Sequence, residues 1–163
     1  MGNKMTDPLE KVKKDALRLL SFRARSTQEL RLRLARKNHG KALVEEAIEY
    51  FTRQGFLDDE KFAKLYAMSR LQSRPSGKKQ IAFDLQSKGV SRAAVDRALG
   101  SLEDFDEKQM ALELALRRQK SMRSVPDQTA KTRLYGLLKR RGFGSEAVFY
   151  ALGKLYKDTG SFE

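Results

Sequence analysis

The chain of 163 residues contains no cysteine and no tryptophan, three prolines and a single histidine. Without cysteine, neither disulfides nor thiolate metal sites can form, which fits a reducing compartment. One histidine cannot build a histidine-rich metal centre, and the place of His39 in a turn beside Gly40 favours an exposed, structural role. We therefore expect no metal and no cofactor.

Long apolar runs are also missing. No stretch approaches the roughly 20 residues of a membrane-spanning helix. The first twenty residues lack the apolar segment of a signal peptide. These absences predict a cytoplasmic protein without a membrane partner.

Residues suited to catalysis are scarce as well. Gly77-Lys78 resembles the end of a phosphate-binding loop, but lysine follows instead of serine or threonine, and no strand precedes it. The acidic run 58–60 lacks the ligand spacing of a calcium or magnesium loop, and acidic residues at a helix start are explained by the helix dipole. No serine nucleophile motif occurs. We predict that the protein is not an enzyme.

Positive charge is what the chain has in excess. Its 34 lysines and arginines exceed its 21 acidic residues, and the formal net charge is +13. A charge beyond the needs of solubility indicates a polyanionic or acidic partner. The basic residues gather at 23–37, 70–88 and 117–141. A charge run can also be only a solvated helix face, and we favour binding because these runs occur in every part of the chain.

Candidate contact residues lie in the second and third basic runs. Lysine and arginine neutralise phosphates and give a salt-sensitive affinity for nucleic acid that does not depend on its sequence. The candidates are Arg70, Arg74, Lys78, Lys79, Lys88, Arg117, Arg118, Lys131, Arg133, Lys139, Arg140 and Arg141. Phe83 is a further candidate, since Ile81 and Leu85 already occupy the inward face of its helix; its alternative role is packing between repeats.

Helix signals recur along the chain at a long period, and no strand-like alternation stands out. Leu34, Asn38, Val44 and Ile48 correspond to Leu85, Gly89, Val95 and Leu99, 51 residues later (34 to 85). The pattern returns 53 residues further on (85 to 138) as Leu138, Gly142, Val148 and Leu152. Recurrence in register is typical of repeat arrays. We predict an all-α fold of three tandem three-helix, helix-turn-helix-like repeats at 1–54, 55–102 and 103–163, with a frayed tail from Asp158.

Several helix boundaries and faces are predicted in more detail. Asp58 is expected to cap a helix of the central repeat. The inward positions of that helix are expected to be Phe62, Leu65, Tyr66 and Ser69. Gly89 reads as a left-handed helix end, and Asp127 as the cap of a helix in the third repeat.

Three motifs, in their order and spacing, resemble the bacterial RecX family of RecA regulators over roughly Ala16 to Leu155. They are Arg23-Ala24-Arg25-Ser26 with Glu29-Leu30, Gly55-Phe56-Leu57-Asp58-Asp59 with Phe62-Ala63, and Gly77…Ile81…Leu85 with Lys88-Gly89-Val90. The resemblance implies an elongated, curved array of three-helix repeats without catalytic residues.

The resemblance also implies a function. Such a protein lies in the groove of the RecA–single-stranded-DNA filament and modulates, mainly inhibits, the recombinase, ATPase and co-protease activities of RecA. It implies roles in DNA repair, DNA recombination and the SOS response, with the RecA filament and single-stranded DNA as partners. We expect a monomer; duplex DNA stays open as a further ligand. Glu45, Glu46 and Glu49 are either contacts to basic patches of the partner or only solvated.

Two alternatives belong to other classes. A helix-turn-helix transcription factor would read duplex DNA through one recognition helix, yet no single helix here carries an obvious set of base-reading side chains. A helical adaptor would bind an acidic protein without nucleic acid. Salt-titrated binding to single-stranded DNA separates the adaptor from a DNA-binding protein.

Overall fold

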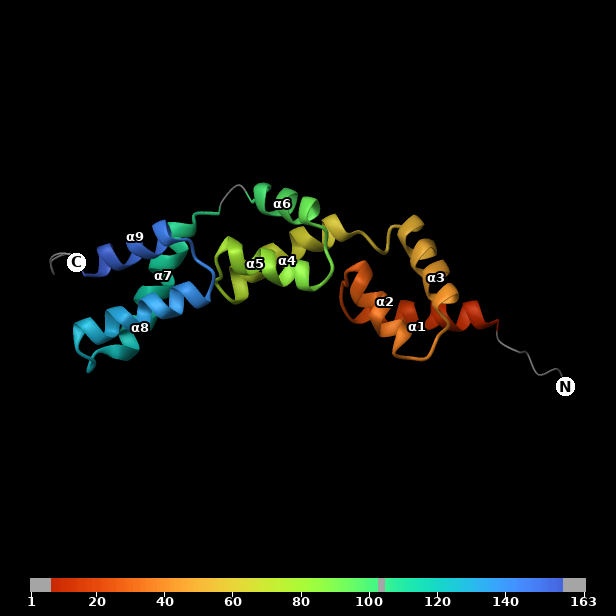
Figure 1. Ribbon diagram of the computed structural model, residues 1–163, viewed down its shortest axis with the longest axis horizontal. Helices are drawn as coiled ribbons and strands as arrows, with labels where there is room; N and C mark the ends of the chain where they lie inside the picture. The colour runs from red at the N-terminus through yellow and green to blue at the C-terminus, as the bar shows by residue number, and fades with distance from the viewer. Residues whose placement is uncertain (1–6, 103–104, 157–163) are drawn as a thin grey trace. The chain divides into compact units, whose positions relative to one another are not determined.

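The computed structural model describes residues 7–102 and 105–156, and all regular structure in these ranges is helical (Figure 1). The elements are α1 (Pro8–Phe22), α2 (Thr27–Ala35), α3 (Lys41–Arg53), α4 (Asp59–Ser73), α5 (Lys78–Ser87), α6 (Arg92–Gly100), α7 (Glu107–Gln119), the 3-10 turn η1 (Lys120–Met122), α8 (Asp127–Arg140) and α9 (Ser145–Leu155). The all-α prediction is confirmed. The predicted frayed tail lies outside the described residues.

The chain folds into two compact units. Unit 1 comprises Met1–Tyr66 and Leu85–Ala98, and unit 2 comprises Ala67–Asp84 and Leu99–Glu163. The border passes through α4, α5 and α6, so that each unit combines one terminal repeat with part of the central one.

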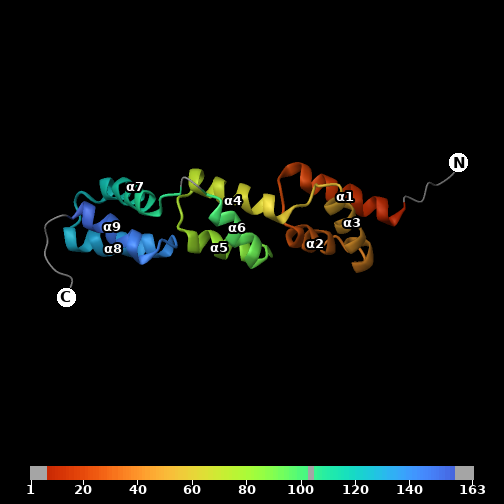
Figure 2. The ribbon, with the colours of Figure 1, turned by 90° about the horizontal axis from the view of Figure 1, so that it is seen from above.

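Each unit contains a core built by three helices. In unit 1, α1, α2 and α3 enclose Val12, Ala16, Leu30, Leu34, Val44, Ala47, Ile48, Phe51 and Leu57. In unit 2, α7, α8 and α9 pack together (Figure 2) and enclose Ala111, Leu114, Ala115, Leu134, Leu138, Phe143, Ala147, Val148, Ala151 and Leu152. The boundaries proposed for the three repeats stay a prediction.

Corresponding positions of the three repeats share both their burial and their backbone conformation. The corresponding leucines Leu34, Leu85 and Leu138 are all fully buried. The helix ends four residues later are all left-handed, with φ of 60° at Asn38, 79° at Gly89 and 76° at Gly142. Glycine adopts this conformation without strain, and asparagine is one of the few other residues that tolerate it. The predicted left-handed helix end at Gly89 is confirmed.

The inward face of α4 differs from the prediction. Leu65 is 50% exposed and Ser69 is also exposed, whereas Phe62 is buried as expected. The remaining buried positions of this face are small: Ala63 and Ala67. Apolar spacing alone favoured the larger side chain, but alanine lets a neighbouring helix come close and takes its place.

Two further local predictions were wrong. Asp127 is the first residue of α8 and not its cap, because Pro126 occupies the cap position and offers no side-chain acceptor. His39 is not exposed: its side chain is 8% accessible, and its Nε2 lies 2.8 Å from Oδ2 of Asp15 on α1. Hydrogen bonds from His39 and Lys37 lower the pKa of the Asp15 carboxyl. The structural role expected for His39 therefore has a specific partner.

In unit 1, the start of α2 carries the connection between the first and central repeats. Ser26 accepts a hydrogen bond from the Glu29 N–H, and its hydroxyl donates to the carbonyl of Lys88. Asp59, the first residue of α4, accepts a 2.8 Å hydrogen bond from the Thr27 N–H. Two segments of the central repeat thus meet the N-terminus of α2.

In unit 2, the start of α5 carries a connection of the same kind to the third repeat. Glu107, the first residue of α7, accepts a 3.0 Å hydrogen bond from the Lys78 N–H. The Gly77 N–H donates to the carbonyl of Arg141 at 2.8 Å. The donors lie 51 residues after Ser26 and Thr27 (26 to 77), and Arg141 lies 53 residues after Lys88 (88 to 141). The hydrogen bonds between neighbouring repeats therefore recur along the chain at the same spacing as the helices.

The left-handed turns lie close against these helix starts. A Cβ atom on Gly89 would lie 2.4 Å from Cβ of Gln28, and one on Gly142 would lie 2.5 Å from the backbone nitrogen of Gln80. Real Cβ atoms do not come this close to other heavy atoms. Glycine is needed here for close approach as well as for its conformation.

Gly77 allows a direct test of the connection in unit 2. Its Cβ would lie 2.1 Å from the carbonyl oxygen of Gly142, so Gly77→Ala should lower the free energy of unfolding by roughly 2 kcal/mol or more in urea titrations. Gly153→Ala is the matched control, since nothing lies within 4 Å of its Cβ and alanine should stabilise α9 by about 0.5–1 kcal/mol. A neutral Gly77→Ala variant would contradict this packing.

Glu29 links the first repeat to the central one inside unit 1. Its carboxylate lies 3.0 Å from Nη2 of Arg23 and 3.1 Å from Nζ of Lys88, and it accepts the Ser26 N–H. Burial raises the pKa of Glu29, but the hydrogen bonds from Arg23, Lys88 and Ser26 outweigh it and bring the pKa from 4.5 to about 2. The ionised form is therefore favoured by folding.

This shift predicts a pH-dependent contribution to stability. Because the pKa is lower in the folded state, the contribution is complete above pH 4.5 and disappears as the pH falls towards 2. Glu29→Gln should lower the free energy of unfolding by about 1–2 kcal/mol at neutral pH, after allowance for solvent screening, and by progressively less in urea titrations at lower pH. Glu49→Gln, on the exposed side of α3, should change it by less than about 0.5 kcal/mol throughout. A deficit for Glu29→Gln that does not shrink would contradict the role of the carboxylate charge.

Candidate nucleic-acid interface

Four of the arginines predicted to bind a polyanion come together in unit 2. Arg70 lies in the last turn of α4 and Arg74 directly follows that helix, while Arg118 lies in the last turn of α7 and Arg141 follows α8. The positive charges of Arg74, Arg118 and Arg70 all act on the guanidinium of Arg141. We call these four residues the arginine cluster. Residues 44 to 71 positions apart in the chain (74 to 118, 70 to 141) thereby form one concentration of charge.

Arg141 fixes this cluster to the connection between repeats. Its Nη1 donates a 3.2 Å hydrogen bond to the carbonyl of Pro75, and its own carbonyl accepts the Gly77 N–H. Burial, followed by the repulsion from the other three arginines, lowers the pKa of Arg141. Arginine nevertheless stays protonated in proteins. The cluster therefore holds like charges together, and an anion bound there would relieve their repulsion.

Carboxylates compensate this charge only in part. Nη2 of Arg70 lies 2.7 Å from Oδ2 of Asp84, and the other oxygen of Asp84 accepts a 2.8 Å hydrogen bond from Gln80. Arg74 and Arg118 are exposed, and within residues 7–102 and 105–156 no carboxylate forms an ion pair with either. Two cations thus face solvent beside two that are fixed by protein contacts.

Lys78 and Lys79 occupy the first turn of α5, where cations are unfavourable for the helix dipole. Both side chains are exposed, and Nζ of Lys78 lies 5.3 Å from the centre of the Phe105 ring. Helix stability does not explain lysines at these positions.

The remaining candidates are placed differently. Arg117, Lys139 and Arg140 lie in the last turns of α7 and α8, where the helix dipole favours cations. Arg133 is exposed and Lys131 half-buried, both on α8. Helix stability accounts for the three residues at these helix ends, as it also does for Arg118 in the last turn of α7.

Lys88 belongs to unit 1 and is engaged in protein contacts. Its Nζ lies 3.1 Å from Glu29 and 5.5 Å from the centre of the Tyr66 ring. Its carbonyl accepts the hydroxyl of Ser26. These contacts explain Lys88 as part of the connection between repeats.

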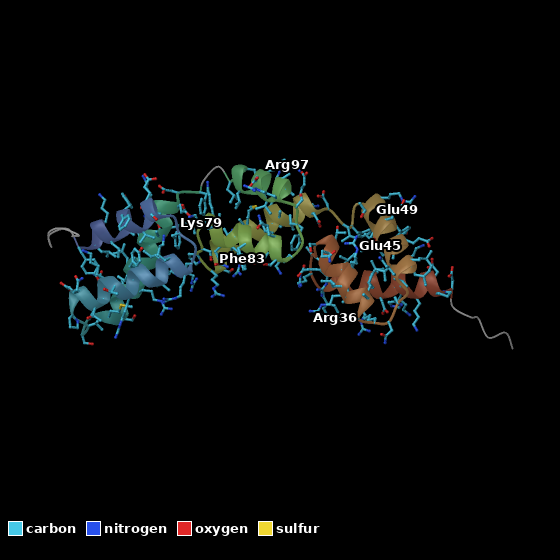
Figure 3. The ribbon with its side chains drawn as sticks, in the orientation of Figure 1. Arg36, Glu45, Glu49, Lys79, Phe83 and Arg97 are labelled. Atoms are coloured by element: carbon cyan, nitrogen blue, oxygen red, sulfur yellow. The ribbon has the colours of Figure 1, made fainter. Side chains whose placement is uncertain are left out.

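Sequence reasoning found the twelve basic candidates but not their grouping. It also missed Glu107, whose only signal was an acidic residue in a first helical turn. Of the acidic candidates on α3, Glu45 pairs with Arg31 at 2.6 Å, while Glu46 and Glu49 are exposed. Figure 3 shows Glu45 and Glu49 on α3.

Two other features are absent from the part of the chain that the structure describes. None of the described residues form a group of three or more histidine, aspartate or glutamate side chains that could share a metal ion. Over the same ranges, no helix combines the length and apolar character needed to cross a membrane.

Each of the three repeats matches a domain of a known protein family. Three family models match in order: the first three-helix domain of RecX at residues 13–51, the second at 58–99 and the third at 106–152. The chain belongs to the RecX family. The resemblance noted in the sequence and the prediction of three tandem three-helix repeats are thereby confirmed. In RecX terms, the arginine cluster joins residues of the second and third domains.

RecX relatives cover most of the chain. The regulatory protein RecX of Chlorobium limicola is 32% identical over 142 residues, 87% of this chain and 87% of that protein. The regulatory protein RecX of Amycolatopsis mediterranei is 31% identical over 152 residues, 93% of this chain and 87% of that protein. The crystal structure of RecX from Lactobacillus salivarius matches with a TM-score of 0.80 at 19% identity, covering 94% of this chain and all of the other, which shows a shared fold. The chain is thus a member of a family of regulatory proteins.

Repulsion within the arginine cluster predicts stabilisation by anions. Millimolar inorganic phosphate should raise the melting temperature by about 2–4 °C relative to sodium chloride of equal ionic strength, because the anion binds the folded state. The double variant Arg74→Gln/Arg118→Gln should lose this response in thermal unfolding. Arg36→Gln, at the end of α2 in unit 1, should keep it. An equal response of both variants would show that phosphate acts elsewhere.

Proposed function

We propose that this protein binds the RecA–single-stranded-DNA filament and modulates, mainly inhibits, its recombinase, ATPase and co-protease activities. It acts in the cytoplasm, in DNA repair, DNA recombination and the SOS response, and it is not an enzyme. The observation that carries the proposal is an arginine cluster assembled across two domains of a RecX-family chain. The regulatory names of the relatives support it.

The mechanism consists of binding alone. Arg74 and Arg118 neutralise phosphates of the filament's DNA, while Arg70 and Arg141, held by their bonds to Asp84 and Pro75, add to the positive field beside them. Lys78 and Lys79 add to the same field from α5. Further contacts of the repeats with adjacent RecA protomers restrain the motions that turnover needs. No proton or group is transferred in these steps.

Both alternatives are less well supported. A helix-turn-helix transcription factor concentrates its base contacts on one recognition helix, whereas the arginine cluster draws on α4, α7 and the end of α8. A nucleic-acid-independent adaptor would place these arginines on carboxylates, which they also bind bidentately, but DNA offers a denser and more regular row of negative charge. Binding to DNA alone, in the absence of RecA, distinguishes the adaptor.

The proposal is tested on a preformed RecA filament. Substoichiometric wild-type protein should slow ATP hydrolysis by the filament, and Arg74→Glu/Arg118→Glu should weaken this inhibition by roughly a hundredfold in half-inhibitory concentration, as expected for two lost and reversed phosphate contacts. Arg36→Glu/Arg92→Glu makes the same change in net charge at exposed positions of unit 1 and should have a smaller effect. No inhibition by the wild-type protein at any ratio would refute the proposed function.

A further inference from the structure

Phe83 on α5 is a large apolar side chain without a place in either core. It is 65% exposed, whereas Ile81 and Leu85 on the same helix are fully buried. Single exposed apolar residues are ordinary on protein surfaces, so exposure alone implies nothing. The surroundings of Phe83 are what distinguish it.

Around Phe83, α5 presents one exposed cation and no unpaired carboxylate. Lys79 lies one helical turn earlier on the same face and is exposed (Figure 3). Asp84, the one acidic residue of α5, is held by Arg70 and Gln80. An aromatic ring is thus exposed to solvent one helical turn from an exposed lysine, both within unit 2.

This combination fits nucleic acid better than an apolar protein surface. Protein-docking patches join several apolar side chains into one area, but Phe83 is the only large apolar side chain exposed on α5. Proteins that bind single strands combine cations along the backbone with aromatic rings on which bases stack. In a duplex, the faces of the bases are already stacked on one another.

We propose that Phe83 stacks on an unpaired base, while Lys79 and the arginine cluster neutralise phosphates of the same strand. The central repeat would then recognise single-stranded DNA by its bases as well as by its charge. The inference rests on the proposed function only in that a DNA strand is the ligand.

Paired oligonucleotides separate stacking from charge. One is a labelled 30-nucleotide oligothymidylate, and the other is an abasic strand of the same length and the same phosphates. Phe83→Ala should bind the oligothymidylate roughly tenfold more weakly than the wild type and the abasic strand equally well, as measured by fluorescence anisotropy. Arg74→Glu/Arg118→Glu should weaken binding of both strands.

Conservative variants test whether an aromatic ring is required. Phe83→Tyr should retain the preference for the oligothymidylate, and Phe83→Leu, which keeps an apolar side chain of similar size, should lose it. Full binding by Phe83→Leu would overturn the stacking role in favour of a general apolar contact. Circular dichroism checks that the variants keep their helices.

Because the chain has no tryptophan, a single introduced tryptophan gives a direct fluorescence reporter. Phe83→Trp introduces the sole indole of the chain, and its fluorescence should be quenched by the oligothymidylate but not by the abasic strand. Phe56→Trp is the matched control, since Phe56 is 59% exposed but lies in unit 1, two residues before Asp58. It should show no base-dependent quenching.

The outcomes distinguish this inference from the proposed function. If Phe83→Ala binds both strands as the wild type does and Phe83→Trp shows no quenching, the inference is wrong, even where the wild type inhibits RecA. If stacking is observed but RecA is unaffected, the proposed function fails and the inference stands.

Discussion

The structure depends on how the second helix of one repeat begins. The first N–H groups of an α-helix have no partner inside the helix. In the first and central repeats, one of these groups donates to a carboxylate at the start of the following repeat: Asp59 for Thr27, and Glu107 for Lys78. A carboxylate at this position also suits the positive end of the helix dipole. Short three-helix repeats with small cores thus acquire directional connections that apolar packing alone does not provide.

The candidate function depends on the same connections. Arg141 donates to Pro75 and receives the Gly77 N–H at the place where the third repeat meets α5. Arg141 can stand among like charges there because its hydrogen bond to the Pro75 carbonyl holds its side chain. A binding surface built in this way needs no deep cavity, and it is suited to a long, regular polyanion.

Much of the fold could be predicted from local chemistry. Capping residues such as Ser26, helix-ending glycines and buried leucines act within one or two helical turns, so their spacing in the sequence reveals them. The face of α4 could not be predicted in the same way. Whether Leu65 or Ala63 turns inward depends on how closely another helix approaches, which the segment itself does not encode. The burial of His39 likewise required Asp15, 24 residues earlier (15 to 39).

The candidate site was predictable in its residue types and not in its geometry. Composition identified lysines and arginines as candidate binding residues, but every basic run gave the same signal. The grouping of Arg74 with Arg118 arises from contacts between repeats. Lys88 looks available for binding in the sequence, but in the structure its side chain contacts Glu29 and the ring of Tyr66. The exposure of Phe83 was predictable, since its neighbours Ile81 and Leu85 fix the orientation of α5.

The left-handed helix ends at Asn38, Gly89 and Gly142 differ in their contacts with neighbouring repeats. Gly89 and Gly142 press against Gln28 and Gln80, and no side chain fits between them. At the corresponding position of the first repeat, Asn38 adopts the same backbone conformation, and its side chain is exposed. Backbone conformation alone admits either residue, whereas contact with a neighbouring repeat admits only glycine. At this repeat position, glycine therefore coincides with contact to a neighbouring repeat, and asparagine coincides with an exposed turn.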